Sequence, residues 1–152
     1  MDKLVLDTNV LIHLARGNKV AEEVKRFVDS KANPQVFISI VSKAEAESLV
    51  VQWGWGERKT AVLRKLIDGF LCIDISQDQN ALIDAYVEID AFSQGKKPTS
   101  KGVLWRDSSR NMGKNDLWIA ATAYVLEAEL LTTDGDFNHL NEHWITVKRF
   151  NR

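Results

Sequence analysis

The fold of this chain is decided near its start, by the stretch Leu4-Val5-Leu6-Asp7-Thr8-Asn9-Val10-Leu11-Ile12. The first three residues form an apolar run that is long enough only for a buried strand, and this run ends in a carboxylate. Thr8 and Asn9 are helix-capping residue types, so the pattern predicts a helix from about Val10. Asp7 is therefore expected at the carboxyl end of a strand, where open parallel α/β sheets bind their ligands.

Working outward, apolar and β-branched runs predict further strands at residues 35–40, 70–75, 130–133 and 144–147. Helical periodicity predicts helices between them, including a long helix after Ser76 and an alanine-rich helix that Asn115 is expected to cap. Strands separated by helices imply right-handed crossovers and a mostly parallel sheet. We therefore expect the α/β class, with a three-layer α/β/α sandwich in one domain spanning residues 1–152.

The formal net charge of −1 gives no overall field that attracts nucleic acid or membrane, but the charge is unevenly distributed. Residues 95–115 carry one acidic side chain against six basic ones: Lys96, Lys97, Lys101, Arg106, Arg110 and Lys114. A basic segment in an otherwise acidic chain fits the binding of a polyanion such as RNA, and it equally fits a solvated, mobile loop. Both interpretations stay open at this point.

Cellular location is expected to be cytoplasmic, with no membrane association. The N-terminal residues lack the basic region followed by a long apolar stretch that marks an export signal. Asp7 interrupts the only apolar run that could serve as such a stretch. No run approaches the ~18 apolar residues that a membrane span requires. The single cysteine, Cys72, lies in an apolar run and is expected to be a small core side chain.

Four carboxylates share the same kind of position. Asp7 and Asp134 each follow a predicted strand, while Glu45 and Asp116 each fall in the first turn of a predicted helix. Carboxylates brought together repel one another and take up protons unless a cation neutralises them. Hard oxygen ligands suit Mg²⁺ or Mn²⁺, and two such ions ~3.5–4 Å apart are a common arrangement for phosphodiester hydrolysis.

Each acid also has a purely structural explanation. Glu45 fits the last position of a capping box that begins at Ser42, and Asp116 fits a helix-dipole partner. Asp134 is followed by glycine in a common turn pair, and Asp136 fits a cap for a short helix at 137–140. Joint occurrence at strand ends favours a shared site.

The motifs that carry these acids together resemble the PIN-domain nucleases, and most of all the VapC-like toxins of type II toxin–antitoxin pairs. They are Leu6-Asp7-Thr8-Asn9, Ile38-Ser39-x-x-Ser42-x-x-Glu45, Asn115-Asp116-x-x-Ile119-Ala120-Ala121 and Leu131-Thr132-Thr133-Asp134-x-Asp136-Phe137. Their order and spacing match the family over nearly the whole chain.

The resemblance implies an Mg²⁺- or Mn²⁺-dependent endoribonuclease that forms homodimers and is inhibited by a cognate antitoxin protein. It implies that Asp7, Glu45, Asp116 and Asp134 form the catalytic and metal-binding cluster, with Asp136 as a possible further ligand. Asn9, Ser42 and Asn115 would be supporting polar residues.

Two features depart from the family pattern. Serine stands at position 42, where threonine is usual, and the basic segment before Asp116 is longer than expected. A catalytically inactive RNA-binding or protein-interaction module with the same fold is the main alternative. A phosphoacceptor receiver-like domain ranks behind it, because such domains pair adjacent acids after the first strand.

Overall fold

The computed structural model describes residues 2–76, 80–105 and 110–152. The chain order of the elements is β1 Lys3–Leu6, α1 Thr8–Arg16, α2 Lys19–Asp29, β2 Gln35–Ser39, α3 Ile40–Gln52, α4 Glu57–Asp68, β3 Leu71–Ile73, α5 Asn80–Ser93, α6 Lys114–Leu126, β4 Glu129–Thr132, the 3₁₀ helix η1 Gly135–Leu140 and β5 Thr146–Arg149. This order confirms the predicted alternation of strands and helices.

The strands of the described chain form one sheet in the order β3-β2-β1-β4-β5, and every neighbouring pair is parallel. After β1 the chain builds outward to β2 and β3, and it later returns to the other side of β1 to add β4 and β5. The order therefore reverses between β1 and β4, and at such a switch point the loops diverge and leave a crevice at the carboxyl ends of the strands.

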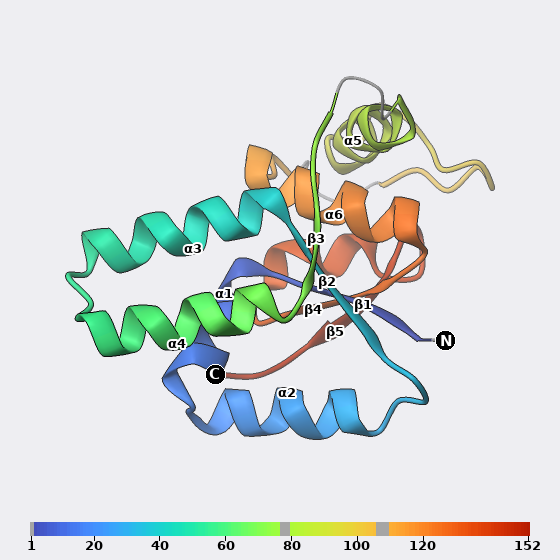
Figure 1. The fold of residues 1–152 in the computed structure, drawn as a ribbon. Helices are drawn as coiled ribbons and strands as arrows, with labels where there is room; N and C mark the ends of the chain where they lie inside the picture. The colour runs from blue at the N-terminus through green and yellow to red at the C-terminus, as the bar shows by residue number, and fades with distance from the viewer. Residues whose placement is uncertain (1, 77–79, 106–109) are drawn as a thin grey trace.

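Helices cover both faces of the sheet, which confirms the three-layer α/β/α sandwich. Side chains alternate along a strand, so Leu4 and Leu6 of β1 pack with α1 to α4, while Val5 packs with α5, α6 and η1. Figure 1 shows α5 and α6 on one side of the strands and α2 on the other. No described helix has the length and apolar character that a membrane crossing requires.

Helix starts differ from the predicted ones. Asp7, rather than Thr8 or Asn9, caps α1, because its carboxylate accepts from the Thr8 amide. Ser39 caps α3 by accepting from the Val41 amide, so the predicted capping box at Ser42 is wrong. Ser42 lies inside α3 and is fully buried.

Asn115 does not cap α6 either. The helix begins at Lys114, its N-cap is Gly113, and no side chain of the described residues caps it. α5 is described from Asn80 onward, and residues 77–79, on which the predicted start of the helix after Ser76 falls, lie outside the described residues.

Cys72 is exposed, contrary to the core position expected from its apolar neighbours. The physical reason is the position of β3 at the edge of the sheet, where Leu71 is also 51% exposed. An apolar run alone does not distinguish a central strand from an edge strand.

We expect Ile119→Ala to lower the free energy of unfolding by about 2–5 kcal/mol, because Ile119 is fully buried and its truncation leaves a cavity. Val125→Ala is the matched control, because Val125 lies on the same helix and is 42% exposed. It should change the free energy of unfolding by less than about 1 kcal/mol. Urea denaturation followed by circular dichroism measures both values. Equal effects would mean that α6 does not pack as described.

Candidate active site

The Asp7 carboxylate is buried at the carboxyl end of β1, with an exposed fraction of 3%. Its Oδ1 accepts a hydrogen bond from the Thr8 amide at 2.7 Å, and its Oδ2 accepts one from the Thr132 hydroxyl at 2.7 Å. Both oxygens are therefore fixed in position by groups that follow β1 or end β4. Such a carboxylate keeps one orientation.

Thr8 joins Asp7 to the third helix. While its amide donates to Asp7, its hydroxyl donates to Oε1 of Glu45 at 2.8 Å. Glu45 lies on α3, in the second turn from the cap at Ser39. One threonine thus sets the separation between two of the predicted acids.

Thr132 joins Asp7 to Asp134. Its Oγ1 donates to Asp7 and accepts from the Asp134 amide at 2.9 Å. Asp134 caps η1, and its Oδ1 accepts from the Asp136 amide at 2.9 Å, so Asp134 rather than Asp136 is the capping residue of that short helix.

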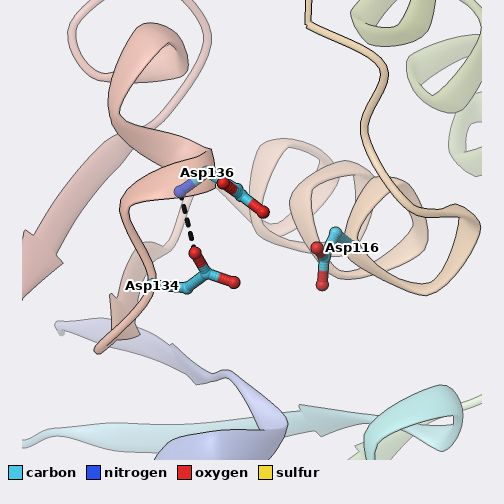
Figure 2. Close-up of side chains that lie close together, drawn as sticks. All are labelled: Asp116, Asp134 and Asp136. Atoms are coloured by element: carbon cyan, nitrogen blue, oxygen red, sulfur yellow. Dashed lines mark hydrogen bonds between the residues drawn. The ribbon is translucent and has the colours of Figure 1, made fainter.

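Asp116 completes the cluster from α6. Carboxylate oxygens of Asp116, Asp134 and Asp136 all lie within 4.8 Å of one another. Figure 2 shows the Asp116 side chain reaching from its helix toward the two aspartates at the start of η1. Three acids from two elements therefore surround one small volume, and Asp7 and Glu45 lie close enough to repel Asp116.

Burial and charge repulsion raise the pKa of two of these acids. Burial raises the pKa of Asp7 from its ordinary 3.8 to about 6; hydrogen bonds from Thr132 and Thr8 oppose the rise, and repulsion from Asp134 and Glu45 adds to it. The pKa of Asp116 is raised to about 7, first by burial and then by repulsion from Asp7, Asp134, Glu45 and Asp136. A cation bound here would favour the ionised forms.

The structure thus brings together Asp7, Glu45, Asp116 and Asp134, the four acids singled out from the sequence. Asp136 belongs to the tightest group, together with Asp116 and Asp134, whereas Asp7 and Glu45 fall outside that group of potential ligands in the described chain.

The three supporting polar residues are placed differently. Asn9 is half-buried in the first turn of α1, and Asn115 is exposed in the first turn of α6. Ser42 is buried one turn before Glu45, and its hydroxyl has no hydrogen-bond partner among the described residues.

The basic segment is partly packed on the domain. Met112 is buried, Trp105 packs against Phe92 and His139, and the Arg110 amide donates to the Ser93 carbonyl at 2.7 Å. The segment is therefore anchored at several points along its described length.

The charges of this segment are mostly exposed. Lys96, Lys101, Arg110 and Lys114 face solvent, while Lys97 pairs with Glu88 at 3.1 Å. Arg106 lies outside the described residues.

Sequence reasoning missed the positioning roles of Thr8 and Thr132. Thr8 was interpreted as a helix cap, and Thr132 received no role. The available signal was a hydroxyl residue within two positions of an acid at the end of a strand, at two places that a parallel sheet brings side by side.

Comparison with solved structures shows the same fold elsewhere. VapBC2 from Rickettsia felis, bound to a DNA fragment from its promoter, is 19% identical with a TM-score of 0.71, covering 98% of this chain and 99% of that one. A toxin–antitoxin complex from Klebsiella pneumoniae is 21% identical with a TM-score of 0.66, covering 98% and 99%. VapC20 from Mycobacterium tuberculosis, a toxin that cleaves the sarcin–ricin loop, is 17% identical with a TM-score of 0.64, covering 95% and 98%.

Sequence comparison assigns the family. No curated protein matches the chain. The profile of the PIN domain matches residues 4–142, a span that runs from β1 to the end of η1 and includes all five clustered acids. The chain therefore belongs to the PIN domain family.

Proposed function

We propose that this protein is a metal-dependent endoribonuclease, with residues 1–152 as one catalytic unit, and that it is the toxin of a type II toxin–antitoxin pair. The observation that carries the proposal is the group of carboxylate oxygens from Asp116, Asp134 and Asp136 within 4.8 Å, beside the buried Asp7. Membership of the PIN domain family and a fold shared with an RNA-cleaving toxin support it.

The donor set fits a hard divalent cation. All the candidate ligands are carboxylate oxygens, which Mg²⁺ and Mn²⁺ prefer over the softer ligands. The pKa values of Asp7 and Asp116 are raised first by burial and further by repulsion from the neighbouring acids, and a bound cation would oppose both effects. We propose Mg²⁺ or Mn²⁺, held by Asp116, Asp134 and Asp136, with Asp7 and Glu45 completing the site.

A bound divalent ion would supply Lewis-acid stabilisation of charge at phosphate and acidify water. The protein residues provide the geometry. The Thr132 hydroxyl holds the Asp7 carboxylate, and the Thr8 hydroxyl holds the Glu45 carboxylate, so the unused lone pairs of both carboxylates keep their orientation. The Asp136 amide, in η1, fixes the Asp134 carboxylate. Fixed ligands avoid reorganisation when charge develops on the substrate.

The substrate is proposed to be RNA, bound through its phosphates. Lys96, Lys101, Arg110 and Lys114 are exposed, and Lys114 begins the helix that carries Asp116. Phosphate contacts of this kind position a strand without reading its sequence.

Partners are proposed from the family and its structural neighbours. A cognate antitoxin is proposed because a neighbour of the same fold is a toxin–antitoxin complex. A homodimer is proposed because helices α3 and α4 expose apolar side chains, including Val51 at 78% and Val62 at 44%.

We expect Asp7→Asn to abolish RNA cleavage, by at least about a hundredfold, while the fold persists. Purified protein is incubated with a structured RNA pool in Mn²⁺, in Mg²⁺ and in EDTA, and cleavage is expected in one or both metals and absent in EDTA. Asp84→Asn, an exposed aspartate on α5, is the matched control and should cleave like the unmodified protein.

Unchanged cleavage by folded Asp7→Asn protein would contradict the proposed role of Asp7. No cleavage by any variant, together with negligible Mn²⁺ binding in a titration, would favour the inactive RNA-binding or protein-interaction module.

Thr132→Val should shift the acidic limb of the pH profile of kcat/KM upward by about one pH unit. The hydroxyl of Thr132 stabilises the ionised form of Asp7, so removing it raises the pKa of Asp7 further and delays its ionisation to higher pH. Thr122→Val is the control, since Thr122 is also buried but donates to the Trp118 carbonyl within α6. Equal shifts in both variants would contradict this role for Thr132.

A further inference from the structure

A second cavity adjoins the acid cluster on the side of β5. Its volume is about 290 Å³, and its lining includes Thr133, Asp134, Gly135, Arg149 and Phe150. Asp134 belongs both to this cavity, called here the β5 cavity, and to the acid cluster. The cavity and the acid cluster are therefore adjacent.

Arg149 supplies positive charge to the β5 cavity. It ends β5, pairs in register with Thr132, and is followed by Phe150, whose amide donates to the Thr132 carbonyl at 2.8 Å. These contacts fix the backbone of Arg149 next to the residues that position Asp7 and Asp134.

Gly135 lets the Arg149 side chain lie close to the backbone beside Asp134. A Cβ atom at position 135 would lie 3.1 Å from a guanidinium nitrogen of Arg149 and 3.3 Å from its central carbon. An alanine at this position would therefore require the guanidinium to shift by a few tenths of an ångström. The glycine allows a close approach of charge to the site.

The guanidinium of Arg149 forms no ion pair within residues 2–76, 80–105 and 110–152, although carboxylates lie nearby. A guanidinium that only balanced the acid cluster would pair with one of its carboxylates. Arg149 is exposed and lines the cavity, so its guanidinium is available to an anionic ligand there.

Thr133 provides a second, independent sign of a ligand. The residue is 4% exposed, and its hydroxyl has no hydrogen-bond partner in the described part of the chain. A buried hydroxyl without a hydrogen-bond partner is unfavourable, and a ligand that accepts a hydrogen bond from it would remove that cost. Thr133 and Arg149 both line this cavity, and hydroxyl and guanidinium donors match the acceptor oxygens of a phosphate.

We propose that the β5 cavity is a phosphate subsite for the RNA strand, in which Arg149 and Thr133 bind the phosphate next to the one at the acid cluster. This inference rests on the proposed nuclease function. The acid cluster then lies between two cationic regions, Lys114 and Arg110 on the α6 side and Arg149 on the β5 side. A single strand crossing from one to the other presents a phosphodiester to the acids.

The test measures RNA binding separately from cleavage. A short, labelled single-stranded RNA of mixed sequence is titrated with protein in Ca²⁺ at several salt concentrations, and gels check that the RNA stays intact. Each phosphate contact contributes about 0.7 to the slope of log Kd against log salt for a single strand. The variants are Arg149→Gln, which removes the charge, and Gly135→Ala, which displaces it. Arg58→Gln, an exposed arginine on α4, is the control with the same change in net charge.

Arg149→Gln is expected to bind about tenfold more weakly and to lose about 0.7 from the slope. Gly135→Ala should weaken binding less than Arg149→Gln does while circular dichroism shows a retained fold, and Arg58→Gln should bind like the unmodified protein. Equal affinities and slopes for Arg149→Gln and Arg58→Gln would overturn the subsite. If metal-dependent cleavage persisted in that case, the nuclease function would stand without it. An unmodified protein that bound no RNA would overturn both.

Discussion

The hydroxyl of Thr132 is the contact on which the site depends. It donates to Asp7 and accepts from the Asp134 amide, so it connects the acid after β1 with the acid after β4. The contact exists because β1 and β4 are parallel neighbours, with Leu6 opposite Leu131, although the two strands are far apart in sequence. The reversal of strand order at this point opens the crevice, and α6 then brings Asp116 to its edge.

This arrangement places charge where folding alone disfavours it. Asp7 is almost fully buried, and burial, with repulsion among the acids added to it, raises the pKa of Asp7 to about 6 and that of Asp116 to about 7. For a carboxyl group whose pKa is raised in the folded state, stability is greatest below its unfolded pKa and decreases as pH rises through the folded value. The two apolar clusters on either face of the sheet compensate for this cost. A divalent cation reverses the effect by favouring the ionised acids, which couples metal binding to the stability of the site.

The sequence predicted the fold class and the cluster of acids because both depend on short-range patterns: an apolar run followed by a carboxylate, repeated where parallel strands end. Helix caps were predicted less well, since Ser39 and Ser42 both fit the start of α3 and tertiary packing decides between them. The exposure of Cys72 depends on strand order, which is a long-range property. The β5 cavity was not predictable, because it requires the register of Thr132 with Arg149 and the close approach at Gly135.

The central claim is that a divalent cation binds the clustered carboxylates and displaces protons from Asp7 and Asp116. Proton release during Mn²⁺ binding tests it most directly, by calorimetry at pH 6.5 in two buffers of different ionisation enthalpy. With pKa values of about 6 for Asp7 and about 7 for Asp116, the account predicts the release of about one proton per protein. Asp116→Asn should release clearly less. Binding of Mn²⁺ without proton release, or no binding at all, would contradict the account.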